Sequence, residues 1–374
     1  MVRFVLKRIL FFITSLGGGG AERVLVNLVN NLDPNKYDIT VQTLFDTGVN
    51  RQYLCPHIKY IPGFKKQFPG NVVLFKAFTP GFLYRSIIKC EYDIVVSYLE
   101  GLPARIVSGC PYKNTKLICW IHVEQNDSVT ASYCFRDFNE AVKCYECFEK
   151  IICVADSVKK DFESIFPLPE PCGVLYNTNE DRIIIDKSKE VIDISFNKSK
   201  CNIITLGRLV NEKGYDRLVR VHKRLLDENI DNCIYVLGDG SERRNIEQSI
   251  NELSLQKSFF LLGFRDNPYK YLSKADLFVC SSRREGFSTS VTEALILGIP
   301  VVSTRCSGAE ELLGSNNEYG IVTENSEEGI YEGLRRMLTE PGLLEEYRSK
   351  ATERGKRFSK ENTVQAVEHL LDSI

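Results

Sequence analysis

Two glutamates stand eight positions apart, Glu285 in a predicted loop and Glu293 within the predicted helix that follows it. The segment Leu277–Cys280 is predicted to be a buried strand, and the helix over Ser288–Leu297 is closed by Gly298. In a doubly wound sheet, the loop after a strand faces the ligand crevice, and the next helix points free N–H groups at the same place. N–H groups suit an anion, whereas carboxylates accept hydrogen bonds from hydroxyls. This stretch therefore predicts a pocket for a diphosphate between a sugar and a ribose.

The same two glutamates also have an ordinary structural explanation. Ser290-x-x-Glu293 matches a capping box, in which Glu293 would only bond the start of the helix. Glu285 could be a solvated loop charge. Spacing alone leaves both explanations open.

Two cations, Arg208 and Lys213, leave a second predicted strand, Asn202–Gly207, on one loop. A helix over Tyr215–Glu228 follows this loop. Two cations on one loop can converge on a departing diphosphate and stabilise its charge. The alternative is a surface loop with two ordinary cations.

In the first half of the chain, four glycines, Gly17–Gly20, separate a predicted strand from a predicted helix. Without side chains, this loop would let a ligand approach the backbone and the helix N-terminus. It lacks the GxGxxG pattern, so a dinucleotide site is weakly supported. A flexible turn is the alternative.

His122 follows the predicted strand Lys116–Ile121. A histidine at the carboxyl end of a strand lies where ligands bind in such sheets. The alternative is a histidine that is satisfied within the core.

The glutamate stretch resembles a motif of retaining glycosyltransferases of family 4, which have the GT-B fold. Glu285-Gly286-Phe287, followed by Glu293-Ala294, is similar to their Glu-x7-Glu motif. The Gly207-Arg208-x4-Lys213-Gly214 pattern and the Gly19–Arg23 loop resemble two further motifs of the family, in the same order. The chain departs from the family at Ser288-Thr289, where Gly or Pro followed by an apolar residue is usual.

The resemblance implies a role for each of these residues. Arg208 and Lys213 would bind the donor diphosphate, Glu285 the donor sugar and Glu293 the ribose, with His122 near the sugar. Four of them are predicted as catalytic: His122, Arg208, Lys213 and Glu285. The further donor-binding residues are Gly19, Gly20, Asn177, Phe264, Gly286, Phe287, Ser288 and Thr289. Because two cations would neutralise the diphosphate, neither a metal nor another cofactor is expected, and the nucleoside diphosphate sugar would be a substrate.

A length of 374 residues favours two domains, and three prolines within 167–171 suggest the boundary. The resemblance predicts an α/β protein of the GT-B type, with two Rossmann-like doubly wound domains facing each other across a cleft. Residues 1–172 would bind the acceptor and 173–357 the donor, and a helix over 358–374 would cross back. Residues 174–179 resemble a strand of the family that ends in Asn, and residues 181–199 are predicted to be a surface linker.

The composition bounds the cellular context. A net charge of −1 gives no reason to expect a nucleic-acid partner, and thirteen unpatterned cysteines indicate a reducing cytosol. Cys144 and Cys147, the one close pair, lie in a predicted helix over Phe135–Lys150 and are predicted to pack it. No run reaches the roughly 20 apolar residues that a membrane-spanning helix needs. The stretch Phe64–Lys89 mixes basic and aromatic residues, so it either covers the sheet or contacts an anionic membrane surface.

Together these features predict a cytoplasmic, peripheral-membrane enzyme. It would move a sugar, with retention of configuration, from a UDP- or GDP-linked donor to a glycan or lipid-linked saccharide. Its pathway would be cell-surface polysaccharide or glycolipid biosynthesis. Two alternatives remain open: a sugar-nucleotide epimerase of the same fold, and a non-catalytic partner subunit.

Overall fold

The computed structural model describes residues 6–17 and 19–374. The chain divides into two compact units. The first unit combines Met1–Thr178 with the C-terminal Thr363–Ile374, and the second is Asn179–Asn362. Gly18 of the predicted glycine loop lies outside the described residues. No helix among those described is long and apolar enough to cross a membrane.

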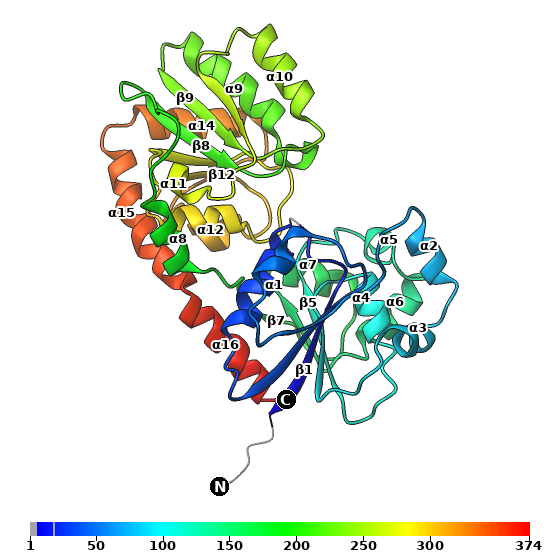
Figure 1. Cartoon of the computed structure of the whole chain (residues 1–374). Helices are drawn as coiled ribbons and strands as arrows, with labels where there is room; N and C mark the ends of the chain where they lie inside the picture. Colours follow the sequence, from blue (N-terminus) through cyan, green and yellow to red (C-terminus); the bar gives the residue numbers. More distant parts are fainter. Residues whose placement is uncertain (1–5, 18) are drawn as a thin grey trace. The chain divides into compact units, whose positions relative to one another are not determined.

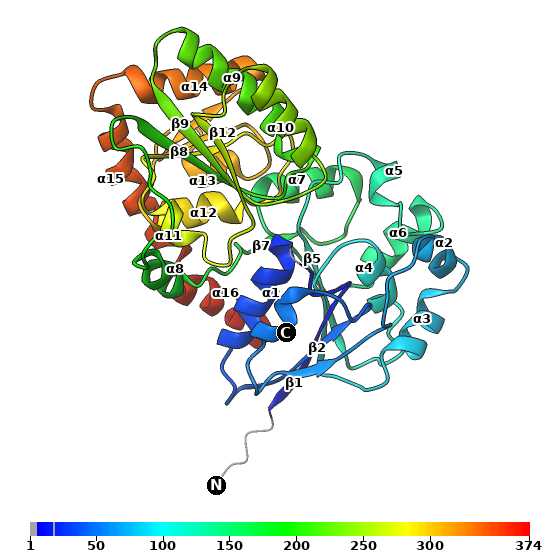
Figure 2. The ribbon, with the colours of Figure 1, turned by 45° about the horizontal axis from the view of Figure 1, so that its top comes forward.

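The first unit is built on a parallel sheet whose strand order is β3-β2-β1-β4-β5-β6-β7 (Figures 1 and 2). The interior strand β1 has the sequence KRILFFI, and its last five side chains are buried because helices cover both faces of the sheet. The strands are β1 (Lys7–Ile13), β2 (Tyr37–Thr43), β3 (Lys59–Ile61), β4 (Ile94–Ser97), β5 (Lys116–Ile121), β6 (Lys150–Cys153) and β7 (Gly173–Val174).

The helices of this unit follow the strands in alternation, as the crossovers between parallel strands require. They are α1 (Gly20–Asn31), η1 (Val49–Tyr53), α2 (Asn71–Lys76), α3 (Pro80–Ile87), α4 (Leu102–Val107), α5 (Ser128–Ala131), α6 (Phe138–Tyr145) and α7 (Asp156–Ile165).

The second unit repeats the plan with a parallel sheet of strand order β10-β9-β8-β11-β12-β13. Its strands are β8 (Cys201–Leu206), β9 (Asn232–Leu237), β10 (Phe259–Gly263), β11 (Leu277–Cys280), β12 (Val301–Thr304) and β13 (Ile321–Thr323). Its helices are α8 (Asp181–Ser188), η2 (Asn211–Lys213), α9 (Tyr215–Asp227), α10 (Arg243–Glu252), α11 (Tyr269–Leu272), α12 (Thr289–Ile296), α13 (Ala309–Leu313), α14 (Glu327–Thr339), α15 (Leu343–Gly355) and η3 (Lys356–Phe358).

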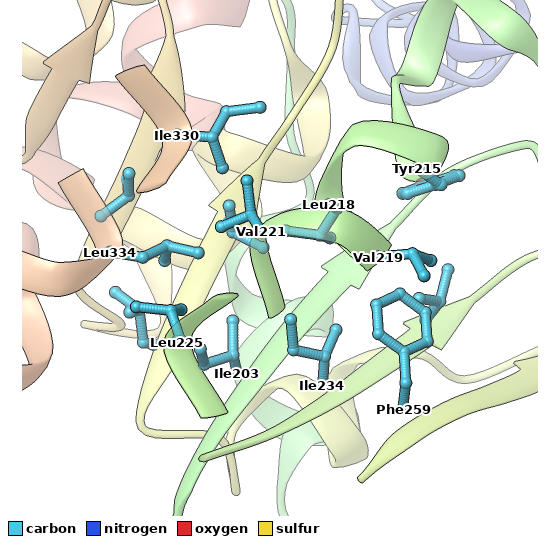
Figure 3. Close-up of a cluster of buried hydrophobic side chains, with 14 of the residues drawn as sticks. Ile203, Tyr215, Leu218, Val219, Val221, Leu225, Ile234, Phe259, Ile330 and Leu334 are labelled. Atoms are coloured by element: carbon cyan, nitrogen blue, oxygen red, sulfur yellow. The ribbon is translucent and has the colours of Figure 1, made fainter. Parts of the chain in front are cut away.

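The core of the second unit lies between its sheet and two covering helices, α9 and α14 (Figure 3). The apolar residues of α9 recur at three- and four-residue spacing and so share one face. These are Leu218, Val221 and Leu225, and all three are buried. They pack with Ile203 of β8 and Ile234 of β9, which fixes the start of α9 against the carboxyl end of the sheet.

The C-terminal helix α16 (Lys360–Asp372) ends on the first unit. Lys7 Nζ donates a hydrogen bond of 2.6 Å to the carbonyl oxygen of Leu371, and Tyr37 Oη donates one of 2.6 Å to Asp372. These bonds fix the helix beside β1 and β2.

Three predicted elements differ from the structure. Residues 181–199 are not only a linker, because they contain α8, whose Ile184 is buried and whose Lys187 carbonyl accepts a hydrogen bond from Asn267. The predicted helix over 135–150 is the shorter α6, and the predicted strand over 174–179 is only β7. Cys144 is buried in α6 as predicted, whereas Cys147 is exposed beyond the end of the helix.

Candidate active site

Both sheets reverse their strand order at one point, and the glycine loop, Arg208, Lys213 and Glu285 follow strands at these points. In the first unit the reversal lies between β1 and β4, and in the second it lies between β8 and β11. Loops at the carboxyl ends of such strands diverge and leave a crevice for ligands. The loop after β8 carries Arg208 and Lys213, and the loop after β11 carries Glu285.

The second unit brings Lys213 and Glu285 into direct contact, since Lys213 Nζ forms an ion pair with Glu285 Oε1. Ser282 Oγ also donates a hydrogen bond of 2.7 Å to Glu285 Oε1. Burial alone would lower the pKa of Lys213, but the neighbouring Glu285 carboxylate outweighs this effect and raises the pKa. Lys213 is therefore a partly buried, permanent cation.

Contacts of Arg283 and a close backbone approach at Gly214 also hold the two loops together. Arg283 forms a bidentate ion pair with Asp216, with both oxygens at 2.7 Å, and its backbone N–H donates to the carbonyl oxygen of Glu212. Gly214 has a φ of 66°, and a Cβ there would lie 2.2 Å from the carbonyl oxygen of Ser281. A glycine is therefore required for the Lys213 loop to approach the Glu285 loop this closely.

The N-terminus of α12 is capped by Ser288, whose side chain accepts a hydrogen bond from the backbone N–H of Val291. This excludes the capping box between Ser290 and Glu293, because Glu293 lies beyond the first turn. Its Oε1 instead accepts a hydrogen bond of 3.1 Å from Tyr269 Oη. The helix begins at Thr289, and the first N–H groups of a helix have no partner within it. They can therefore bind an anion.

Other predicted donor-binding residues of this unit differ in what they can offer a ligand. The ring of Phe287 is buried and packs against Phe358, so only its backbone can take part. Gly286 lies beside Gly308, where an added Cβ would meet the Gly286 carbonyl oxygen at 3.0 Å. Arg208 and Phe264 are exposed, so both side chains are accessible to a ligand.

In the first unit, His122 follows β5 and is buried. Burial lowers the pKa of its ring to about 4, so the imidazole is neutral at pH 7. The ring hydrogen-bonds the backbone of Tyr98, whereas Nε2 has no hydrogen-bond partner. A ring nitrogen that bonds a carbonyl carries the proton, so Nε2 is left with a lone pair that can accept a hydrogen bond from a hydroxyl.

Sequence reasoning missed Glu100, which lies beside this histidine. Its Oε2 accepts a hydrogen bond of 2.9 Å from the backbone N–H of His122, and burial raises its pKa. Glu100 follows β4, the strand that pairs with β5. A carboxylate just after the strand next to that of His122 was a signal that the sequence already carried.

The glycine loop of the first unit places Gly19 as the N-cap of α1 and Gly20 as its first residue. The cap contributes no side chain, and the Glu22 carboxylate lies close over Gly19, 2.2 Å from where a Cβ would be. Asn177 is buried close to the end of this unit's main segment. Within the described part of the chain, no group of three or more His, Cys, Asp or Glu residues could hold a metal ion.

Two family models together match most of the chain. Residues 18–178 match the model described as Glycosyltransferase Family 4, and residues 186–358 match that of glycosyl transferases group 1. The chain is a family 4-like glycosyltransferase. The expected motifs Gly19–Arg23 and Arg208–Glu293 fall within these two matches.

Relatives of this glycosyltransferase include one similar over nearly its whole length. This chain is 29% identical to a Campylobacter jejuni enzyme named N-acetylgalactosamine-N,N'-diacetylbacillosaminyl-diphospho-undecaprenol 4-alpha-N-acetylgalactosaminyltransferase, over 95% of this chain and 96% of that protein. It is 33% identical to the 2-deoxystreptamine N-acetyl-D-glucosaminyltransferase of Niallia circulans, over 40% of this chain and 39% of that protein.

Solved structures of other proteins share the fold. Anabaena HepE in complex with UDP and glucose has a TM-score of 0.78 at 19% identity, covering 98% of this chain and all of that one. TarM has a TM-score of 0.76 at 15% identity, covering 99% of both chains. The predictions of a GT-B α/β fold and of a glycosyltransferase are confirmed, whereas the roles of single residues stay predictions.

Proposed function

We propose that this glycosyltransferase moves a sugar from a UDP-linked donor to a lipid-linked saccharide, with retention of the anomeric configuration. The observation that carries the donor half of the proposal is the contact between Lys213 and Glu285 at the reversal point of the second sheet. This contact places Lys213, a cation that can bind phosphate, next to Glu285, a carboxylate that can accept hydrogen bonds from sugar hydroxyls. UDP as the nucleotide is supported by HepE, which has been crystallised with UDP and with UDP-glucose.

Each part of the donor has a matching group in the second unit. The diphosphate would lie against Lys213, the exposed Arg208 and the N-terminal N–H groups of α12. Glu285 would accept hydrogen bonds from hydroxyls of the transferred sugar. Glu293 would accept those of the ribose, beside the Tyr269 hydroxyl that already bonds it. No part of this arrangement relies on a metal ion, because the two cations supply the positive charge.

The reaction would take place on one face of the sugar. The acceptor hydroxyl oxygen forms a bond to the anomeric carbon while the bond from that carbon to the β-phosphate oxygen breaks. The electron pair of the broken bond stays on the phosphate, which takes the proton of the acceptor hydroxyl. Lys213 and Arg208 stabilise the negative charge that develops on the phosphate. Glu285, paired with Lys213, is a hydrogen-bond acceptor here and not a nucleophile.

In the first unit, His122 would accept a hydrogen bond from a sugar hydroxyl at Nε2. A neutral ring is suited to this role because a protonated imidazolium has no lone pair. Glu100 positions the histidine through its backbone N–H. We place Glu100 as a positioning residue.

The acceptor half rests on the relatives. The Campylobacter jejuni enzyme acts, by its name, on a diphospho-undecaprenol saccharide, and two others from Rhizobium meliloti are named for lipopolysaccharide core biosynthesis. The first name states a lipid-linked saccharide and the other two state a cell-surface glycan pathway. Together they support a lipid-linked saccharide of such a pathway as the acceptor.

The test is a transfer assay with a panel of UDP- and GDP-sugars and a short-chain polyprenyl-diphosphate saccharide as acceptor. We expect one UDP-sugar to be consumed only with acceptor present, and NMR of the product to show the anomeric configuration of the donor. An inverted product would contradict retention. Isomerised sugar nucleotide formed from donor alone would instead identify an epimerase.

A further inference from the structure

The first unit exposes a group of large apolar side chains on or next to α2, α3 and α5. These helices lie on one side of this unit in both views (Figures 1 and 2). Val73 and Val129 are the most exposed, at 71% and 79%. We call this group the apolar face, and it consists of Val73, Leu74, Phe78, Phe82, Val129 and Tyr133. Most side chains of this kind are buried in the unit, so their exposure here calls for a partner.

These three helices come from two separate segments that touch one another. Lys76 Nζ lies 5.4 Å from the ring centroid of Tyr133. Arg136 Nε donates a hydrogen bond of 2.8 Å to the carbonyl oxygen of Lys76. The rings of Phe78 and Phe82 stack with their centroids 5.0 Å apart. The segment that carries α2 and α3 and the segment that carries α5 are therefore joined at Lys76, Tyr133 and Arg136.

Buried contacts hold the turn between α2 and α3 in place. Arg105 is fully buried and donates hydrogen bonds of 2.9 Å to the carbonyl oxygen of Phe75 and 2.8 Å to that of Phe78. Arg136 bonds the two carbonyls between them, those of Lys76 and Ala77. Two guanidinium groups thus satisfy four successive carbonyls, so the exposed side chains project from a fixed backbone.

The segment that carries α2 and α3 has charge of one sign, whereas α5 is preceded by Asp127, whose carboxylate caps that helix. Between Asp46 and Glu91 the chain contains no Asp or Glu, but seven basic residues: Arg51, Lys59, Lys65, Lys66, Lys76, Arg85 and Lys89. Arg51 and Lys59 are neutralised by Asp46 and Asp38. Among the ion pairs of residues 6–17 and 19–374, none involves the other five. Their charge is available to an anionic partner.

We propose that the apolar face docks the first unit onto an anionic lipid bilayer. Exposed apolar side chains flanked by cations match the boundary between acyl chains and anionic headgroups. A protein partner would also need acidic groups around an apolar centre, whereas a bilayer offers both over any area. The inference extends the proposed function, because a lipid-linked acceptor is embedded in such a surface.

The test is co-sedimentation with vesicles, and it needs no activity. We expect the wild-type protein to sediment with phosphatidylglycerol-containing vesicles at low salt and to stay in solution with phosphatidylcholine alone. The variant K65Q/K66Q/K89Q should bind about 100-fold more weakly, since each cation near an anionic surface contributes about a factor of five. The matched control is K198Q/K257Q/K274Q, three exposed lysines of the second unit, which should bind as the wild type does.

A second variant pair tests the apolar contribution. V73S/F82S should lose vesicle binding, whereas V191S, which alters an 87% exposed valine of the second unit, should not. Wild-type protein that stays in the supernatant at low salt would overturn the inference. So would equal loss in the control variants, or a dimer that V73S/F82S converts to monomer, because the face would then join two copies of the chain. Transfer to a water-soluble acceptor analogue should be unchanged in V73S/F82S, which separates failure of docking from failure of the proposed function.

Discussion

The ammonium of Lys213 and the carboxylate of Glu285 form an ion pair, although the two residues are predicted to bind different parts of the donor. The pair bridges the loops after β8 and β11, the two strands between which the sheet order reverses. Each side chain thus holds the other in position before a ligand arrives, with Ser282 as a second support for the carboxylate. Such preorganised groups need little rearrangement when charge develops on the donor.

The first prediction is that Lys213→Ala lowers kcat by about 100-fold or more, because it removes a cation aimed at the departing diphosphate. The measurement is the transfer assay at saturating donor, together with a melting temperature. The matched control is Lys223→Ala, which removes a lysine paired with Asp227 on the exposed side of α9. Turnover of Lys213→Ala equal to that of the control would show that the loop is an ordinary surface.

The second prediction is that Glu293→Gln weakens UDP binding by roughly 10-fold at a nearly unchanged melting temperature. The amide keeps the shape and can still accept the hydrogen bond of Tyr269, but hydroxyls bond a charged acceptor more strongly than a neutral one. Calorimetric titration with UDP measures the effect. Glu340→Gln, which alters a carboxylate paired with Arg336, is the control. An unchanged affinity with lower stability would assign Glu293 a purely structural role.

The βα repeats and most of the site loops could be predicted from the sequence because strand, glycine and helix signals alternate without interruption. β11 and β5 have the predicted bounds, and Lys213 and Glu285 meet as their places after neighbouring strands require. Local patterns could not reveal α8, because a charged, irregular segment becomes helical there through packing in its own unit.

The capping-box explanation of Glu293 also shows the limit of local sequence patterns. Ser290-x-x-Glu293 satisfies the capping-box pattern, yet the cap of the helix is Ser288, two residues before Ser290. A shift of two residues at a helix start is within the ambiguity of sequence signals. Likewise, the role of Glu100 follows from its hydrogen bond to the backbone of His122, which is 22 residues away in the chain. The sequence does not show this contact.

The third prediction concerns pH. The folded pKa of His122 is about 4, below the ordinary value of 6.5, so the unfolded chain binds a proton that the folded chain does not. The contribution of His122 to the stability of the first unit should therefore be level above pH 7 and fall as pH drops from about 6.5 toward 4, by about 1.4 kcal/mol per pH unit. Urea unfolding followed by the fluorescence of Trp120, the single tryptophan, reports on this unit.

His122→Gln should flatten this dependence between pH 6.5 and 5, a window above the ordinary titration of carboxylates. His222 in the second unit serves as a comparison, because its pKa is also lowered to about 4 by burial but Trp120 does not belong to that unit. Equal slopes in wild type and His122→Gln would contradict a neutral, buried His122.

The last prediction is that Arg105→Met destabilises the first unit by about 3–5 kcal/mol, because it leaves the buried end of an ion pair and two carbonyls without their donor. Glu140 is the partner carboxylate. Burial alone would raise its pKa, but hydrogen bonding and positive charge from Arg105 and Arg136 together outweigh burial, so the net shift of the pKa is downward. The double variant Arg105→Met/Glu140→Leu should recover part of the loss, since no carboxylate then remains unpaired. Arg85→Met, at an exposed arginine of α3, should change stability by no more than about 0.5 kcal/mol. Urea unfolding monitored at Trp120 measures all three, and a loss in Arg105→Met as small as that in Arg85→Met would show that the turn between α2 and α3 does not depend on this guanidinium.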